Sequence, residues 1–395
     1  MKFKTTPLLG CGLLILLTCI MIVISGSYFL YYILILEIVT VLLMYVIITR
    51  NERKTWQSLR ISEDEVVVGD EVKIEIKSNN TSMIPIAYAK IQSKLYNNHN
   101  EMVFPSENMF INPYQIINIR ENFEIKTRGI FTKGVIHTEF SDPLRIFSRS
   151  RHIEKDIQLV VYPKVYDLNY FYLPSTGLLG TKKVSKSGHE DFSSLKKVRK
   201  YNPGDSFKRI HWKVSSKRGE MYVKEYEATS STKMNLFVDA FNEHYIGDDN
   251  RVLEDKIVEI AASVSKYVLK ENTDMTMVYH IDKLTQVESR DLSKFPTILK
   301  ELVTFVAKGS VTLSELLNQE TKRLESGSFV VLVTPTITDA LVNTVLGLTR
   351  RRFEISLILV NDDEEEATEM LRAMGVHVYH ISLEDDIKER LEAFS

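Results

Sequence analysis

The feature that most constrains this chain is a long apolar stretch near its first residue. Between Thr5 and Ile48 the only charged side chain is that of Glu37. A membrane helix needs about 20 apolar residues to cross roughly 30 Å of hydrocarbon, so this stretch is too long for a single span. Ser25-Gly26-Ser27 divides it into two segments of suitable length, residues 8–24 and 28–48. We therefore predict a two-helix transmembrane hairpin within residues 1–50.

The charges that flank the hairpin predict its orientation. Lys2 and Lys4 precede the first segment, while Arg50, Arg53 and Lys54 follow the second, and the turn is uncharged. Positive charges favour the cytoplasmic side, so we expect both ends and the bulk of the chain to be cytoplasmic, at a plasma membrane crossed twice. The alternative is a cleaved signal peptide. It is disfavoured because no small-residue cleavage pattern follows the first segment and a second apolar segment comes at once.

Glu37 lies near the middle of the second predicted span. An acidic side chain at that depth costs about 2.5–3.5 kcal/mol on insertion scales. It is either an ion-handling group or a protonated carboxyl that is hydrogen-bonded to the neighbouring helix. We favour the second interpretation, because two spans alone cannot build a transport pathway.

In residues 56–165, apolar and polar side chains alternate with a period of two. Val72, Ile74 and Ile76 alternate with charged residues, and similar short runs recur between turn dipeptides such as Asn112-Pro113 and Asp142-Pro143. Short strands at this spacing, with no long helix between them, predict an antiparallel β-sandwich.

Residues 234–395 alternate between apolar strands and amphipathic helices. The strand at 234–240 is followed by a helical pattern at 253–269, and four further strands alternate with helices after it. This alternation predicts an α/β domain with a parallel sheet that is covered on both faces, whose site lies at the carboxyl ends of the strands.

A basic segment, predicted as a linker over residues 166–233, separates these two domains. The whole chain has 50 Lys or Arg against 52 Asp or Glu, which argues against general nucleic-acid binding. Residues 182–224, however, contain thirteen Lys or Arg and four acids, a net charge of +9. Such a cluster could bind phosphate, a lipid head group or a nucleotide. Alternatively, it forms an internal network in which Asp205 pairs with Arg199 or Arg209 and Trp212 fills a domain junction.

The string at residues 199–213 resembles the signature of the bacterial "domain of unknown function 58" family. The residues of this motif are Arg199, Tyr201, Pro203, Gly204, Asp205, Lys208, Arg209, Ile210, Trp212 and Lys213, with Lys208 where Arg is commoner. Landmarks at Arg128-Gly129, Asp142-Pro143 and residues 161–163 extend the resemblance upstream. It implies a membrane-anchored protein without an established enzymatic activity, whose genes often travel with those of MoxR-type AAA+ ATPases and transglutaminase-like proteins. We therefore expect a AAA+ ATPase and a transglutaminase-like membrane protein as partners.

The C-terminal domain resembles a von Willebrand factor A-like domain. In its full form such a domain binds Mg²⁺ through D-x-S-x-S after the first strand, plus a Thr and an Asp on later loops. Asp239 matches, but Phe241 and Glu243 replace both serines; Thr312 is the Thr candidate, and Thr334 or Asp339 could supply the last ligand. Because Mg²⁺ requires a compact oxygen shell, we expect a degenerate site with no metal or other cofactor. His244 has no second His at ligand spacing, so we expect a surface residue.

The remaining features argue against an enzyme. The only cysteines are Cys11 and Cys19, which excludes thiol catalysis beyond the predicted membrane segment. No phosphate-binding loop, H-E-x-x-H or G-x-S-x-G motif occurs, and a hydrolase built on Asp205, His211 or His189 would lack a positioned nucleophile. Residues 361–395 hold eleven acids and three bases, which are either a docking face or solvated helix surfaces. We therefore expect a cytoplasm-facing adaptor whose contact edge includes Asp239, Thr312 and the loop around Phe241, with an anionic-ligand module as the alternative.

Overall fold

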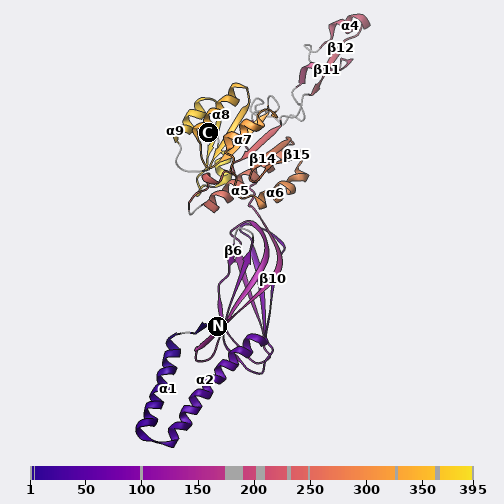
Figure 1. The fold of residues 1–395 in the computed structure, drawn as a ribbon. Helices are drawn as coiled ribbons and strands as arrows, with labels where there is room; N and C mark the ends of the chain where they lie inside the picture. The colour runs from indigo at the N-terminus through magenta and orange to yellow at the C-terminus, as the bar shows by residue number, and fades with distance from the viewer. Residues whose placement is uncertain are drawn as a thin grey trace. The chain divides into compact units, whose positions relative to one another are not determined.

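The computed structural model describes residues 2–3, 5–97, 101–173, 190–201, 210–228, 233–247, 250–324, 328–360 and 365–393. The chain divides into two compact units, Met1–Tyr162 and Pro163–Ser395, which are described separately (Figure 1).

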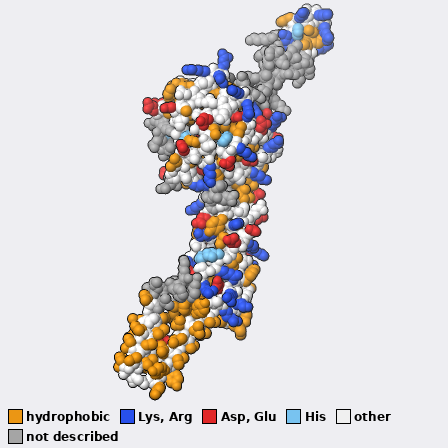
Figure 2. Space-filling view, in the orientation of Figure 1, with side chains coloured by type: hydrophobic (Ala, Val, Ile, Leu, Met, Phe, Trp, Pro, Cys, Tyr) orange, Lys and Arg blue, Asp and Glu red, His pale blue; other side chains and the backbone are white. Residues whose placement is uncertain are grey.

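Unit 1 begins with two apolar helices, α1 (Thr5–Ser25) and α2 (Tyr28–Lys54). Gly26 has a φ of 60°, a left-handed conformation that glycine adopts readily where a helix ends. Among the described helices, only α2 is long and apolar enough to cross a membrane; the apolar stretch Leu9–Ser25 is shorter. Hydrophobic side chains cover both helices (Figure 2). The Thr18 hydroxyl of α1 lies 3.0 Å from Glu37 Oε1 of α2, which is the kind of interhelical contact we favoured for Glu37.

Two sheets follow the helices. One contains β2 (Thr55–Ile61), β4 (Glu71–Asn80) and β8 (Ile116–Glu124) in the order β2-β4-β8. The seven-stranded sheet is built from β1 (Lys2–Phe3), β3 (Glu65–Val67), β5 (Ile86–Tyr96), β6 (Glu101–Val103), β7 (Glu107–Ile111), β9 (Gly129–Ser141) and β10 (Phe147–Tyr162). The pairings are antiparallel except β3 with β10. Apolar residues of both sheets share one core, so the sheets pack face to face as the alternating pattern predicted.

The end of α2 is part of this sandwich. Ile48 is buried in the core that both sheets share, and Asn51 is buried and donates from Nδ2 to the Pro85 carbonyl (3.4 Å). Arg149 of β10 forms an ion pair with Glu52 at 2.6 Å, and this pairing raises the pKa of the Arg149 guanidinium. No residue separates α2 from β2, since α2 ends at Lys54 and β2 begins at Thr55.

Unit 2 contains a six-stranded sheet in the order β15-β14-β13-β16-β17-β18. Its strands are β13 (Met234–Val238), β14 (Met275–His280), β15 (Leu284–Ser289), β16 (Phe329–Thr334), β17 (Glu354–Leu359) and β18 (His377–His380). All neighbours are parallel except the edge strand β15. The expected parallel core is therefore present, with an antiparallel edge that the sequence pattern did not reveal.

Helices cover both faces of this sheet. One face packs against α5 (Asn250–Lys270), α6 (Phe295–Thr304) and α10 (Ile387–Glu392), and the other against α7 (Leu313–Glu320), α8 (Asp339–Arg350) and α9 (Glu365–Ala373). Two short 3-10 helices, η2 (Asn242–His244) and η3 (Leu292–Lys294), lie in the connections. Successive buried residues of β13 alternate between the two cores, as expected for a central strand.

The boundary between the units differs from the predicted linker. Residues directly after Tyr162 belong to the α/β core: Leu168, Phe171 and Leu173 are buried there. The Phe171 ring stacks on Tyr379 with centroids 5.3 Å apart. The sequence pattern did not reveal this segment because it forms no regular element and is recognised only by its long-range contacts.

Within residues 166–233, the structure describes an antiparallel pair of strands with a short helix. These are β11 (Glu190–Lys200), α4 (Trp212–Arg218) and β12 (Tyr222–Ala228), and we call them the basic arm. The Ser215 hydroxyl accepts the Tyr222 N–H at 2.9 Å and so holds α4 against β12.

Candidate functional site

The candidate site lies at the carboxyl edge of the α/β sheet, between β13 and β16. The chain leaves β13 through α5 toward β14, whereas it leaves β16 through α8 toward β17, on the other side. Loops that depart in opposite directions open a crevice at this point in open α/β sheets. Asp239 directly follows β13, and Thr334 is the last residue of β16.

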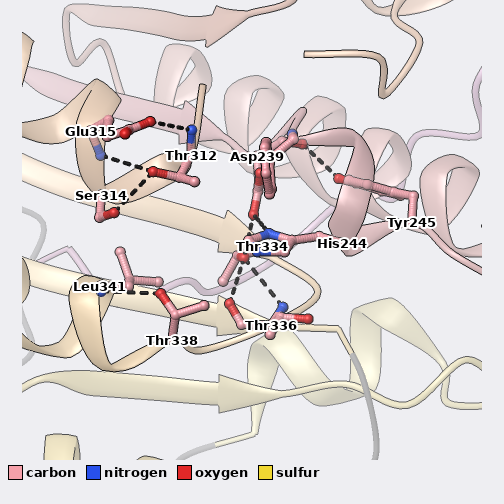
Figure 3. A network of polar contacts seen from close by, with 11 residues as sticks. Asp239, His244, Tyr245, Thr312, Ser314, Glu315, Thr334, Thr336, Thr338 and Leu341 are labelled. Atoms are coloured by element: carbon pink, nitrogen blue, oxygen red, sulfur yellow. Dashed lines mark hydrogen bonds and ion pairs between the residues drawn. The ribbon is translucent and has the colours of Figure 1, made fainter. Parts of the chain in front are cut away.

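The Asp239 carboxylate is buried, and both of its oxygens form hydrogen bonds with nearby residues (Figure 3). Oδ1 accepts the Phe241 N–H at 2.9 Å. Oδ2 lies 2.7 Å from His244 Nδ1 and accepts the Thr334 hydroxyl at 2.7 Å. Since an ionised carboxylate can only accept, the His244 ring donates from Nδ1. Burial of this charge is therefore offset by three donors.

Hydrogen bonds to backbone carbonyls hold the loop that carries His244. The Tyr245 hydroxyl donates to the Asp239 carbonyl at 2.6 Å, and the Asn242 N–H donates to the Gly309 carbonyl at 2.9 Å. A Cβ at Gly309 would clash with the carbonyl oxygens of His280 and Ala240, so only glycine allows these loops to approach. These contacts hold the loop against the edge of the sheet.

The other predicted metal ligands lie away from Asp239 or are used differently. Thr312 caps α7: its hydroxyl accepts the Glu315 N–H at 3.3 Å, and Glu315 Oε2 accepts the Thr312 N–H at 3.0 Å. Asp339 is the exposed first residue of α8. Glu243 is exposed, and the half-buried Phe241 ring packs edge-on against His244 with centroids 5.0 Å apart.

These contacts do not fit a bound Mg²⁺. The ion needs open carboxylate and hydroxyl oxygens in an octahedral shell, but both Asp239 oxygens already accept hydrogen bonds and Thr312 serves as a helix cap. Among the described residues, no group of three or more His, Cys, Asp or Glu is arranged to hold a metal.

His244 corrects one of our expectations. We expected a surface residue, but its side chain is only 12% exposed and bonds Asp239. Thr334, which we considered only as a metal ligand, supplies the hydroxyl donor, and Tyr245 was not anticipated. An Asp followed five residues later by His, directly after a buried strand, was the available signal. The hydrogen bond from Thr334 to Asp239 could be predicted only by knowing that β13 and β16 are neighbouring strands.

The outer surface of this edge combines apolar and acidic groups. Ile246, directly after Tyr245, is 80% exposed, and Glu243 and Asp339 are exposed on the two adjoining loops. Ile246 is thus the large exposed apolar side chain beside the buried Asp239 network among the described residues of this edge.

The sequence motif is split between described and undescribed residues. Pro203, Gly204, Asp205, Lys208 and Arg209 lie outside the described residues, and so do Asp205's proposed pairings. Ile210 is buried and forms an isolated antiparallel bridge with Val223. In the β11–β12 ladder, Arg199 lies opposite the same Val223. Tyr201 donates its N–H to the Met221 carbonyl at 2.9 Å.

Trp212 is 68% exposed, which does not match the interpretation that it fills a junction. Lys213, Lys217 and Arg218 on α4 are also exposed. The pKa of Lys200 is raised by its hydrogen bond and ion pair with Glu220, and that of Arg218 by its hydrogen bond to Tyr222. Lys200 and Arg218 therefore remain cationic near neutral pH.

The comparisons with known proteins agree with the family resemblance over part of the chain. The family described as "Protein of unknown function DUF58" matches residues 197–376, which run from the end of β11 to the loop before β18. "Uncharacterized protein YeaD" of Bacillus subtilis (strain 168) is 27% identical over 139 residues, which cover 34% of this chain and 32% of that protein. The match thus spans about a third of that relative's length.

Solved structures resemble parts of the chain only distantly. The CARDB domain of PF1109 from Pyrococcus furiosus is 12% identical at a TM-score of 0.21, covering 27% of this chain and 93% of that one. The sporulation control protein Spo0M from Bacillus subtilis is 16% identical at a TM-score of 0.19. The match covers 27% of this chain and 49% of that one. Proximal thread matrix protein 1 from the mussel byssus is 12% identical at a TM-score of 0.30. The match covers 41% of this chain and 46% of that one.

The Asp239 network predicts a stability effect at Thr334. Thr334→Val keeps the shape of the side chain but removes a donor from a buried carboxylate, which costs about 1–3 kcal/mol. We expect faster amide hydrogen exchange in β13 and β16 of the detergent-solubilised full chain. Thr344→Val on α8 is the control, with an expected change within about 0.5 kcal/mol. Its hydroxyl donates to the Ala340 carbonyl of its own helix and accepts from Asn318 Nδ2 at 3.3 Å, and both bonds are exposed to solvent. Unchanged exchange in Thr334→Val would show that the network does not stabilise the edge.

Proposed function

We propose that this protein is a membrane-anchored, non-enzymatic adaptor of the bacterial plasma membrane whose two units face the cytoplasm. The observation that carries the proposal is the carboxyl edge of the α/β sheet. Its central carboxylate is already bonded by His244 and Thr334, whereas Ile246 projects from it into solvent. Such an edge is suited to contact a protein rather than to coordinate a metal.

The anchor in this proposal is the α1–α2 hairpin, with both helices crossing the bilayer. Support comes from the attachment of its two ends to the sandwich. Lys2 and Phe3, before α1, pair with Ser148 and Phe147 of β10. After α2, the Thr55 carbonyl accepts Arg151 Nη1 of the same strand at 2.6 Å. Two ends held by one strand lie on one side of the membrane, and this supports an even number of crossings.

Cysteine labelling tests this topology. In a Cys11→Ser/Cys19→Ser background, Ser27→Cys lies in the turn and should react with a membrane-impermeant maleimide added to intact cells, because the turn would face outward. Asn122→Cys, at an exposed position on β8, should react only after the cells are permeabilised. Labelling of the Asn122→Cys variant on intact cells would place the sandwich outside and remove the cytoplasmic part of the proposal.

The α/β domain is, in this proposal, a von Willebrand factor A-like domain that has exchanged its metal for a histidine. Three observations support this assignment: the doubly wound sheet, an aspartate directly after the first central strand, and a helix-capping Thr on a later loop. The resemblance to the domain of unknown function 58 family suggests a MoxR-type AAA+ ATPase as the partner, with a transglutaminase-like membrane protein as a further component. The adaptor would hold this assembly at the membrane during cell-envelope or complex-assembly processes.

A binding experiment tests the adaptor role. The detergent-solubilised full chain should capture a co-encoded AAA+ ATPase, and Ile246→Asp should abolish capture because it places a charge at the centre of the contact. Val252→Asp, which changes an exposed position on α5, should leave capture intact and controls for added charge. Equal capture by both variants would exclude this edge as the contact. No capture by the folded wild-type protein would exclude this partner.

The basic arm favours a second candidate, an anionic-ligand module. Lys200, Lys213 and Lys217 are exposed together with Trp212, a side chain that combines apolar area with a hydrogen-bond donor. Binding of a phosphorylated ligand through these groups would weaken steeply with added salt, since screening acts on exposed charges. Capture of the ATPase through the Ile246 edge would depend much less on salt.

A further inference from the structure

One end of the sandwich carries an unusual set of exposed apolar side chains. Strand register identifies this end: Trp56 and Ile116 both pair with Asn79, so the three residues form one row across the three-stranded sheet. Trp56 follows the last residue of α2 by two positions. This row therefore lies at the end of the sandwich from which the apolar helix departs.

Three loops reach the same end. The β4–β5 loop is joined to α2 by the Thr81 N–H, which donates to the Lys54 carbonyl at 2.9 Å. The β7–β8 loop is joined to it in turn by the Tyr114 N–H, which donates to the Ser82 carbonyl at 3.3 Å. The β9–β10 loop connects Ser141 to Phe147, and the Phe147 ring meets Tyr45 of α2 with centroids 5.9 Å apart.

These loops and the strand ends beside them expose apolar side chains that we call the apolar collar. Met83 is 72% and Tyr114 is 64% exposed, and the most exposed large apolar side chain at the opposite end, that of Val103, reaches 48% among the described residues. The collar consists of Trp56, Met83, Phe110, Tyr114, Ile116 and Leu144. Trp and Tyr are the side chains that favour the membrane–water interface, because each combines an apolar ring with a polar group.

Strained backbone positions occur in and directly beside the collar, and positively charged side chains lie next to it. Tyr114 and Arg145 have φ values of 57° and 55°, left-handed conformations that cost a residue with a Cβ about 1–2 kcal/mol. Arg145 lies over the Tyr88 ring at 4.3 Å, and Arg50, Arg53 and Lys54 are exposed on the last turns of α2. Cations beside aromatic rings match an anionic head-group layer, at about 1 kcal/mol for each Lys or Arg.

The depth of the collar follows from its contacts with α2. The helix has 27 residues, so it is about 40 Å long, whereas the hydrocarbon layer is about 30 Å thick. The Tyr45–Phe147 contact lies ten residues before Thr55, about 15 Å along the helix. The sandwich therefore overlaps the last part of α2, and its loops reach the level at which the helix would leave the hydrocarbon.

We propose that the apolar collar lies within the head-group layer of the membrane that holds α2. The sandwich is then seated on the lipid surface, and its loops act as a second attachment in addition to the hairpin. This inference rests on the membrane anchoring proposed above. It commits to a lipid surface as the occupant because the collar is continuous with the apolar helix and is surrounded by positive charge.

Tryptophan fluorescence can test this arrangement, because the chain contains only Trp56 and Trp212. The full-length Trp212→Phe variant is reconstituted in vesicles of phosphatidylethanolamine and phosphatidylglycerol that contain phosphatidylcholine brominated near its carbonyl groups. We expect loss of Trp56 emission relative to unbrominated vesicles. In a Trp56→Phe/Trp212→Phe background, Met83→Trp should lose emission in the same way. Val103→Trp, at the opposite end of the sandwich, should not.

The outcomes distinguish the collar from the anchor. Resistance of the vesicle-bound protein to alkaline carbonate extraction reports membrane insertion independently of the collar. If the protein resists extraction and neither Trp56 nor the indole introduced by Met83→Trp is quenched, the collar inference is wrong while the anchor stands. Equal quenching at positions 56, 83 and 103 would mean that the sandwich does not contact the lipid end-on, which also overturns the inference. If carbonate removes the protein, both the anchor and the collar fail.

Discussion

The direct junction between α2 and β2 constrains everything that precedes the α/β unit. A flexible linker between a membrane helix and a folded domain would let the domain tumble freely. Here Ile48 is buried in the core of the sandwich, and Asn51 and Glu52 bond to residues of the surrounding strands and loops. Rotation of the helix would break this packing, so the orientation of the sandwich is coupled to that of the helix. Any membrane that holds α2 therefore also determines which loops of the sandwich face it.

A second constraint acts within the α/β unit, where Asp239 must be buried at the centre of the sheet edge. A buried carboxylate requires donors or a cation. In this chain the donors come from three places: the backbone of Phe241, the ring of His244 and the hydroxyl of Thr334. These bonds hold the loop after β13 against the end of β16. Ile246, Glu243 and Asp339, the first residue of α8, are exposed on the outer side of this edge.

The elements that could be predicted from the sequence are those in which apolar residues recur with a strong local pattern. The two long apolar segments, the alternation around Val72–Ile76 and the apolar strands of the α/β unit all correspond to helices or strands. Two strands without a strong local pattern were missed. β1 pairs with β10, which lies far along the chain, and β15 is the edge partner of β14, which directly precedes it. Phe171 lies in an irregular segment that is recognisable only by its ring contacts with Tyr267 and Tyr379.

The candidate site follows the same division. Asp239 stands out in the sequence because it directly follows a buried strand, and the loss of both serine hydroxyls argued against a Mg²⁺ site. The partnership of Asp239 with Thr334, 95 residues away, was decided by the strand order, because only adjacent parallel strands bring their carboxyl ends together. The sequence by itself thus determined which segments are apolar, which are strands and which charges cluster. Tertiary structure decided which side chains meet and which remain exposed, because burial and hydrogen bonding depend on neighbours in space rather than along the chain.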